Sequence, residues 1–414
     1  RGSRSRGTLS VTSGAYESPS IQFLGSAARL EVMKPKPLFS IGLFADAQYA
    51  DKDDYERPSE KGRTKYFRAV PERLAVALRD FKSKGEGLAC VVNLGDLYDG
   101  VNDDDVTVEV PTRMGAIPAH LASKNRADLD LMAALVRTGA GGIPVYHCLG
   151  NHDLNLPRHE VTAALGNPGG ASYFTVKLPR GWRLVVLDTT DVNPRYLDPG
   201  SAAQAAGEAY VRAAKAEGVV EVKPWGGGVG PEQMEWLGGQ LRAAEAAGER
   251  LVVASHIALS TTGARPGMSA WNARDIAPVL EASPAVALCI AGHDHPGGYG
   301  RTLVKDQDGL NTFGRVHYVT LEAMLEAPEG STSYAILEVY EHEVAIVGVG
   351  QATSRRLQVS PDGVFTGVAT FGRAMDVMES GMEGEVVVER SEMGLLDWIN
   401  ANRGSMGGGD VELR

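Results

Sequence analysis

Short runs of apolar, β-prone residues recur along the middle of the chain, and a polar cluster follows each of them. From Phe39 onward these runs predict buried strands over residues 39–46, 88–96, 144–151, 249–257 and 285–295. Amphipathic spacing predicts helices over residues 64–84, 122–138 and 231–247. Strands that are apolar almost throughout are typical of sheets whose two faces are both covered.

Two further segments predict antiparallel strands. Residues 172–179 and 182–189, joined by Arg180-Gly181, have the pattern of a β-hairpin. Residues 315–324 and 333–350 predict an antiparallel set that closes the core. Strands alternating with helices, followed by a strand-rich end, indicate an α/β (α+β) protein built on a mixed sheet or on a pair of sheets covered by helices.

The two ends of the chain lack this periodicity. We expect residues 1–38 to be a poorly ordered N-terminal extension, residues 39–353 to be one domain, and residues 354–414 to be a weakly packed C-terminal appendage with a short helix at 395–403. The arginines among the serines and glycines of the first residues leave open the remnant of an organelle transit peptide.

Charge and composition narrow the class of protein. The formal net charge is −11, from 41 Lys and Arg against 52 Asp and Glu, which argues against a broad surface for nucleic acid or anionic membranes. No apolar run is long enough to span a membrane. Cys90, Cys148 and Cys289 lie in predicted strands without a CxxC partner, so we interpret them as core thiols. They favour a cytoplasmic protein, with an organelle as the alternative.

Side chains that bind metals stand at the carboxyl ends of five predicted strands. The clusters are Asp46-Ala47-Gln48, Gly95-Asp96-Leu97-Tyr98-Asp99, Gly150-Asn151-His152-Asp153, Ser255-His256 and Gly292-His293-Asp294-His295. Open α/β sheets place their sites on the loops after the carboxyl ends of strands, so we expect the clusters to meet. Carboxylates, amides and imidazoles together suit Mn²⁺, Mg²⁺, Fe or Zn²⁺. The pattern predicts a two-metal site of a phosphoester or phosphoanhydride hydrolase.

Each cluster taken alone also has an ordinary structural explanation. Asp46 would commonly belong to a turn, Asp96 and Asp99 would be turn residues as well, and His256 would be a histidine of the core. The run 293–295 is the most specific, because imidazoles at i and i+2 can face different metals. The structural explanations would have to hold at all five places at once.

These clusters make residues 39–350, approximately, resemble the calcineurin-like metallophosphoesterases. Within that superfamily the chain resembles the manganese-dependent ADP-ribose/CDP-alcohol diphosphatases. The segments that carry this closer resemblance are AQYADKDD (47–54), LGDLYDG, LGNHD, LDTTD (187–191), WGGGVGPEQMEWL (225–237), AWNARD (270–275), AGHDHPGGYG (291–300) and VTLEAMLEAPEG (319–330). The resemblance implies a four-layer αββα sandwich of two mixed β-sheets flanked by helices, with residues 39–353 as the catalytic domain.

The resemblance also implies a role for each site residue. The expected metal ligands are Asp46, Gln48 and His295 for the first metal, Asn151, His256 and His293 for the second, and Asp96 as the bridge. His152 would protonate the leaving oxygen or stabilise negative charge on the phosphoryl group. Asp153 would orient the His152 imidazole without binding metal itself, and Asp99 would also be a supporting residue outside the ligand set. Most of the superfamily has histidine where Gln48 stands, and the harder amide oxygen favours Mn²⁺ or Mg²⁺.

The activity implied is hydrolysis of the diphosphate bond in small nucleoside-diphosphate compounds. ADP-ribose would give AMP and ribose 5-phosphate, and CDP-alcohols would give CMP and a phosphoalcohol, by in-line attack of a hydroxide held between two divalent ions, with Mn²⁺ preferred. We expect a monomer with this small-molecule partner and with neither nucleic acid nor membrane. Arg63 and Lys65 are candidates to contact the diphosphate. Met268, Trp271 and Asn272, on the loop after His256, are candidates to line the nucleobase end.

Two alternatives remain open at this point. One is a phosphodiesterase or phosphomonoesterase that uses the same metal core. The other is a catalytically silent binding module, against which every expected ligand position holds a side chain that can bind metal.

Overall fold

The computed structural model describes residues 36–56, 62–100, 119–305, 311–359 and 369–371. All of the strands and helices that the structure describes belong to the compact unit Pro37–Arg414. Almost all of the predicted N-terminal extension, and the helix predicted at 395–403, lie outside the described residues. Among the helices that are described, none combines the length and the apolar character needed to cross a membrane.

The first sheet has seven strands in the order β17-β16-β15-β14-β1-β4-β5. Its parallel strands are β1 (Phe39–Phe44), β4 (Leu88–Asn93) and β5 (Val145–His147). Its antiparallel strands are β14 (Ser333–Val339), β15 (Glu343–Gly350), β16 (Ser354–Gln358) and β17 (Ala369–Phe371). Because β16 pairs with β15, the predicted domain boundary at 353 falls ahead of two strands of this sheet.

The second sheet has six strands in the order β10-β13-β9-β8-β7-β6. Its four central strands run parallel: β13 (His317–Thr320), β9 (Val286–Ala291), β8 (Arg250–Ala254) and β7 (Trp182–Val186). The antiparallel edge strands are β10 (Gly298–Gly300) and β6 (Phe174–Leu178). The pairing of β6 with β7 confirms the predicted hairpin.

The predicted closing set of strands is half wrong. β14 and β15 do pair antiparallel, but β13 lies in the other sheet, parallel to β9. Every residue of β13 is buried, which is the pattern of a central parallel strand. Two small ribbons complete the strands: β2 (Tyr55–Glu56) with β3 (Thr64–Lys65), and β11 (Leu303–Lys305) with β12 (Asn311–Phe313).

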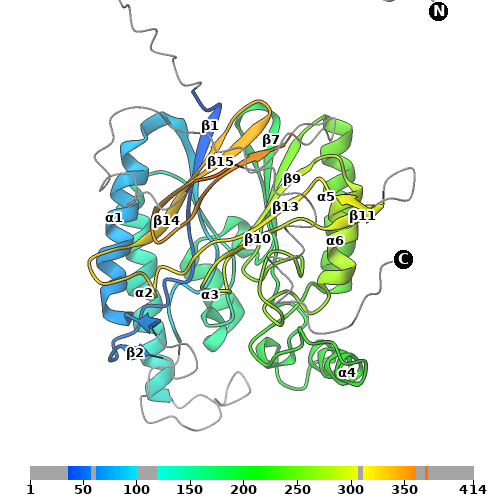
Figure 1. Cartoon of the computed structure of the whole chain (residues 1–414). Helices are drawn as coiled ribbons and strands as arrows, with labels where there is room; N and C mark the ends of the chain where they lie inside the picture. Colours follow the sequence, from blue (N-terminus) through cyan, green and yellow to red (C-terminus); the bar gives the residue numbers. More distant parts are fainter. Residues whose placement is uncertain (1–35, 57–61, 101–118, 306–310, 360–368, 372–414) are drawn as a thin grey trace, which may run out of the picture. The chain divides into compact units, whose positions relative to one another are not determined.

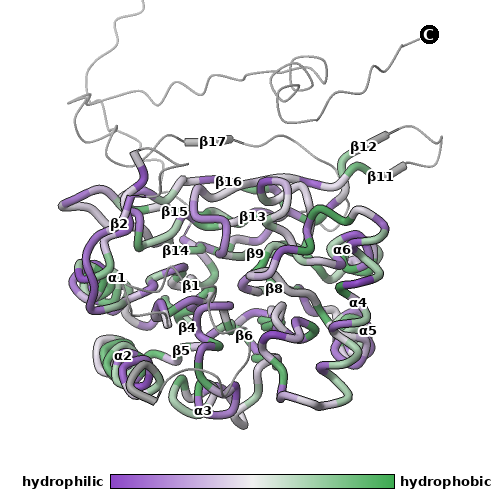
Figure 2. Tube along the Cα trace, turned by 90° about the horizontal axis from the view of Figure 1, so that it is seen from below, coloured by the Kyte–Doolittle hydropathy of each residue, from purple (hydrophilic) through white to green (hydrophobic). Residues whose placement is uncertain are grey.

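Helices cover the outer face of each sheet, as Figures 1 and 2 show. Over the first sheet lie α1 (Val70–Ser83), α2 (Ala119–Ala140) and α3 (Arg158–Leu165). Over the second lie α5 (Pro231–Ala247) and α6 (Ala273–Ala282), and α4 (Ala202–Ala216) follows β7 in the chain. Single-turn 3₁₀ helices occur at Phe67–Ala69, Gly85–Gly87, Asp153–Asn155, Pro168–Gly170, Pro179–Gly181 and Pro194–Tyr196.

The core between the two sheets is apolar. Ile41 and Leu337 from the first sheet and Leu184, Val252 and Ile290 from the second belong to one buried cluster. Separate clusters lie under the helices on each outer face. The layers are therefore helix, sheet, sheet and helix, which confirms the four-layer αββα sandwich.

The predicted helices are found with shifted bounds. The helix at 231–247 matches α5, with Pro231 in its first turn. The helix predicted from residue 64 begins only at Val70, because Thr64 and Lys65 pair with β2 and Pro71 sits in the first turn of α1.

Candidate metal centre

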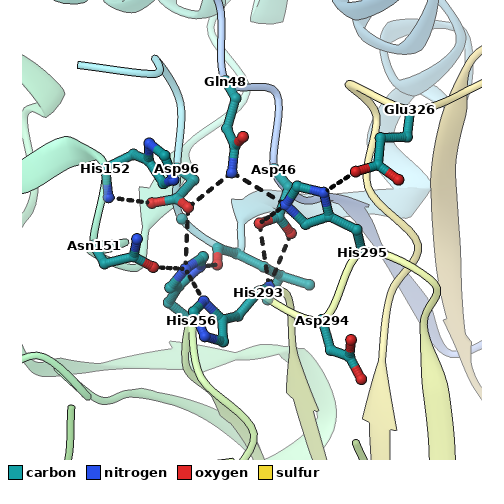
Figure 3. A network of polar contacts seen from close by, with 12 residues as sticks. Asp46, Gln48, Asp96, Asn151, His152, His256, His293, Asp294, His295 and Glu326 are labelled. Carbon is teal, nitrogen blue, oxygen red and sulfur yellow. Dashed lines mark hydrogen bonds and ion pairs between the residues drawn. The ribbon is translucent and has the colours of Figure 1, made fainter. Parts of the chain in front are cut away.

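The seven predicted metal ligands, scattered over 250 residues of sequence, lie together where the two sheets meet (Figure 3). Parallel strands of both sheets end at this place, so their following loops converge. The ligands after the first sheet are Asp46, Gln48, Asp96 and Asn151, and those after the second are His256, His293 and His295. Six of them are buried, and the side chain of His295 is 11% exposed.

One group of ligands surrounds the imidazole of His256. Its Nε2 lies 3.1 Å from Asn151 Oδ1, 3.2 Å from His293 Nδ1 and 3.3 Å from Asp96 Oδ2. Its Nδ1 lies 2.8 Å from the carbonyl oxygen of Leu94, which can only accept a hydrogen bond. Nδ1 therefore carries the proton, and Nε2 is the nitrogen that would coordinate a metal.

The other group is formed around Gln48. Its Nε2 lies 3.1 Å from Asp96 Oδ2 and 3.2 Å from His295 Nε2, which is itself 3.5 Å from Asp46 Oδ1. Asp96 therefore contacts both groups, as a bridging carboxylate would. Metal ligation by Gln48 requires its amide oxygen, which a half-turn of the amide brings to the same place.

The backbone at these ligands is held in an uncommon conformation. Asp46, Gln48, Asp96 and His293 have φ values of 49°, 46°, 55° and 69°, whereas Arg180 in the hairpin turn is the only other described non-glycine residue with positive φ. Each such residue costs about 1–2 kcal/mol, and such strain concentrates at functional sites.

Two glycines allow the loops to approach. A Cβ at Gly150 would overlap Asp96 Oδ1, and a Cβ at Gly292 would lie 2.6 Å from Asp46 Oδ2. Glycine is required at both positions because a larger residue would push the carboxylates out of place.

The site buries ionisable side chains whose pKa values are shifted by burial and by one another. Burial raises the pKa of Asp46, and burial together with the neighbouring His256 holds the pKa of His293 well below its usual value. For Asp96, burial opposes ionisation, but His256 and His152 outweigh it and lower the pKa. Two carboxylates, two amides and three imidazoles around a shared oxygen are a donor set that fits a pair of divalent cations.

His152 lies beside this centre and contacts Asp99. Its Nδ1 is 2.6 Å from the carbonyl oxygen and 3.3 Å from Oδ1 of Asp99, so Nδ1 donates and Nε2 stays available. The side chain of His152 is 28% exposed. Burial lowers the pKa of His152, but the carboxylates of Asp96 and Asp99 outweigh burial and raise it.

The role expected for Asp153 is wrong in one respect. Its carboxylate accepts the backbone N–H groups of Asp96 (2.9 Å), Leu97 (2.8 Å) and Gly150 (2.9 Å), and Asp99 takes the contact with the imidazole instead. The physical reason is that Asp153 begins a 3₁₀ turn which points its side chain to the loop after β4. Asp153 therefore ties two ligand-bearing loops together.

Glu326 belongs to the site although the sequence pattern did not predict it. Its Oε1 lies 2.5 Å from His295 Nδ1, and its side chain is 4% exposed. Glu326 follows β13, which runs parallel to β9 and so ends at the same edge of the second sheet. A correct placement of β13 would have added this strand end to the five that were recognised.

The candidates for substrate contact differ in their surroundings. Lys65 Nζ lies 3.5 Å from Gln48 Oε1, and Arg63 forms an ion pair with Glu326. Trp271 is 4% exposed and stacks on Tyr210, and Asn272 bonds to the backbone of residue 229. Trp271 and Asn272 therefore stabilise the fold, and their packing does not support the predicted nucleobase contact.

Comparison with known proteins places the chain in a family. A family model described as calcineurin-like phosphoesterase matches residues 67–297. The chain belongs to this family. Among its relatives, the manganese-dependent ADP-ribose/CDP-alcohol diphosphatase of Arabidopsis thaliana is 30% identical over 345 residues, which cover 80% of this chain and 98% of the relative. The human protein of the same name is 25% identical, over 79% of this chain and 95% of that protein.

A solved structure supports the fold. The crystal structure of a dimetal phosphatase from Danio rerio superposes with a TM-score of 0.64 at 24% identity, over 78% of this chain and all of that one. At this level of identity, the likeness concerns the sandwich of sheets and helices.

Proposed function

We propose that the protein is a manganese-dependent hydrolase of the diphosphate bond in small nucleoside-diphosphate compounds. Its substrates are ADP-ribose, which gives AMP and ribose 5-phosphate, and CDP-alcohols, which give CMP and a phosphoalcohol. The observation that carries the proposal is the convergence of seven ligand side chains from two sheets on a shared Asp96 (Figure 3). The relatives named manganese-dependent ADP-ribose/CDP-alcohol diphosphatase match along most of the chain.

Each side chain has a defined part at the centre. Asp46, Gln48 and His295 would hold one metal, Asn151, His256 and His293 would hold the other, and Asp96 lies between the two groups as their shared ligand. When bound, two divalent cations neutralise charge on the phosphoryl oxygens and make water a better nucleophile at neutral pH. The imidazoles of His256 and His295 keep their Nε2 atoms directed at this place because Nδ1 of each ring is held, by the carbonyl oxygen of Leu94 and by Glu326 respectively.

His152 is the acid that assists the departing oxygen. Burial opposes protonation, but the carboxylates of Asp96 and Asp99 raise the pKa of His152 and so favour the protonated imidazole, whose Nε2 is the nitrogen that can donate. Asp99 holds Nδ1, and Lys52 Nζ lies 2.5 Å from Asp99 Oδ2. Although burial opposes it, the imidazole of His152 together with Lys52 lowers the pKa of Asp99, so that this carboxylate stays ionised.

Lys65 supplies charge for the substrate. Its ammonium group lies 3.5 Å from the end of the Gln48 amide that faces away from Asp96 and His295, so Lys65 lies at the rim of the metal centre. A diphosphate carries negative charge on two phosphoryl groups. The ammonium group of a lysine at the rim of the centre would offer these oxygens a positive charge in addition to the metals.

A substrate panel tests the proposal. Purified protein is assayed with Mn²⁺, Mg²⁺ or Zn²⁺ on ADP-ribose, a CDP-alcohol, cyclic nucleotides and a phosphomonoester. Formation of AMP and ribose 5-phosphate, fastest with Mn²⁺, is the expected result. Faster turnover of cyclic nucleotides or of the monoester would show a phosphodiesterase or phosphomonoesterase instead. Protein that binds no metal would be a silent binding module.

A further inference from the structure

We propose that Glu326 is a positioning residue of the metal centre, which holds His295 in its ligating orientation, and that Arg63 in turn holds Glu326. The inference rests on the proposed metal centre and extends it to a side chain outside the ligand set. Glu326 Oε1 lies 2.5 Å from His295 Nδ1, and the Glu326 side chain is 4% exposed. Figure 3 shows the carboxylate on the far side of the imidazole from Asp46 and Gln48.

This contact determines which nitrogen of His295 faces the metal. An ionised carboxylate can only accept, so Nδ1 carries the proton and Nε2 presents its lone pair to the centre. Nε2 lies 3.2 Å from Gln48 Nε2 and 3.5 Å from Asp46 Oδ1. A carboxylate behind a histidine also makes the ligating nitrogen more basic, and loss of such a partner typically weakens metal binding by about 10–100-fold.

Arg63 supports the ionised state of Glu326. It precedes β3 and pairs with Glu326 Oε2, so the small β2–β3 ribbon reaches the back of the metal centre. The guanidinium of Arg63 places a permanent positive charge beside Oε2, and this charge favours the ionised form of the Glu326 carboxylate.

The loop that carries Glu326 is itself fixed on several sides. The backbone N–H of Ala323 donates to His295 O and that of Leu325 to Asp46 O, each at 3.0 Å. From α1, the buried guanidinium of Arg73 donates to the carbonyl oxygens of Leu325 at 2.9 Å and Ala327 at 2.7 Å. The fixed backbone of this loop therefore holds Glu326 in position beside His295.

The histidines of the two proposed metal positions have different partners behind them. His256, in the other group, holds its Nδ1 proton on the neutral carbonyl of Leu94 at 2.8 Å, whereas His295 holds its proton on a carboxylate. Removal of Glu326 should therefore weaken one metal position and leave the other nearly unchanged.

The experiment measures Mn²⁺ binding to metal-free, full-length protein by calorimetry, with electron paramagnetic resonance to count bound ions. Glu326→Ala should raise the Kd of one of two sites by about 10–100-fold. Glu326→Gln should have a smaller effect, because its amide oxygen still accepts from His295. The matched control is Glu329→Gln, at an exposed residue of the same loop, and this variant should bind Mn²⁺ like the wild type.

The role of Arg63 is tested in the same way. Arg63→Ala should weaken the site that Glu326→Ala weakens, by a few-fold, and Arg63→Lys should restore part of that loss.

The inference is overturned if Glu326→Gln and a folded Glu326→Ala both bind two Mn²⁺ ions with wild-type affinity, or if both sites weaken equally. Circular dichroism reports folding, and the near-isosteric Gln variant keeps the test decisive if the Ala variant does not fold. Failure of the proposed function looks different. In that case the wild-type protein binds two ions but leaves ADP-ribose and CDP-alcohols intact, whatever residue stands at 326.

Discussion

At the scale of single residues, the metal centre is an arrangement of hydrogen-bond partners that fix which atom faces inward. His256 is held by Leu94, His295 by Glu326 and His152 by Asp99, each through Nδ1. The ligand types were readable from the sequence, because carboxylates, amides and imidazoles follow apolar runs. The partners of the imidazoles were not, because they come from other loops.

His152 is predicted to act on the leaving group without holding metal. His152→Ala should lower kcat by about 10²-fold or more while the Mn²⁺ content per chain stays unchanged. His159→Ala, at an exposed position of α3, is the matched control and should behave like the wild type. Steady-state kinetics and metal analysis together check this, and loss of metal from the His152 variant would contradict the role.

Lys65 is predicted to act on substrate binding. Lys65→Ala should raise KM for ADP-ribose about tenfold, with a small change in kcat, because a charged contact to phosphate is worth about 1–2 kcal/mol. Lys82→Ala, exposed on α1, should leave both constants unchanged. Equal KM values for the Lys65 variant and the wild type would show that Lys65 does not contribute to substrate binding.

At the scale of elements, parallel strands decide where the chemistry lies. β1, β4 and β5 end at one edge of the first sheet, and β8, β9 and β13 end at one edge of the second. α1 contributes from outside the sheets, through Arg73, which is 5% exposed and ties the loop after β13 to this helix.

Arg73 is predicted to stabilise the fold as well as the loop. Arg73→Ala should lower the free energy of unfolding by about 2–4 kcal/mol, because it leaves several carbonyl groups without their donor. Arg79→Ala, on the exposed face of the same helix, should change it by less than about 0.5 kcal/mol. Urea denaturation of the two variants measures the difference, and equal values would refute the role of Arg73.

At the scale of the whole molecule, each sheet buries a histidine outside the metal centre. His147 ends β5, and His317 lies in β13 between Tyr299, 3.0 Å from its Nδ1, and the carbonyl oxygen of Gln358, 2.8 Å from its Nε2. Burial lowers the pKa of each to about 4. Both are therefore neutral in the folded protein, as expected for packed histidines.

This predicts a loss of stability in acid. Between about pH 6.5 and pH 4 the unfolded chain takes up protons at these histidines that the folded chain refuses, so the free energy of unfolding falls as the pH falls. The loss is at most about 3 kcal/mol for each histidine and is absent above this window. Urea denaturation at several pH values should show a shallower decline for His317→Gln. An identical decline in variant and wild type would contradict the prediction.

The sequence by itself determined most of the long strands, three of the six α-helices that the structure describes, and the kinds of metal-binding side chain, because burial and backbone geometry impose local periodicities of two and 3.6 residues. Only the tertiary structure decided that β13 joins the second sheet, that Asp99 rather than Asp153 contacts His152, and that Glu326 stands behind His295. The physical reason is that these partners meet through strand pairing and loop packing between distant segments, on which local periodicity carries no information.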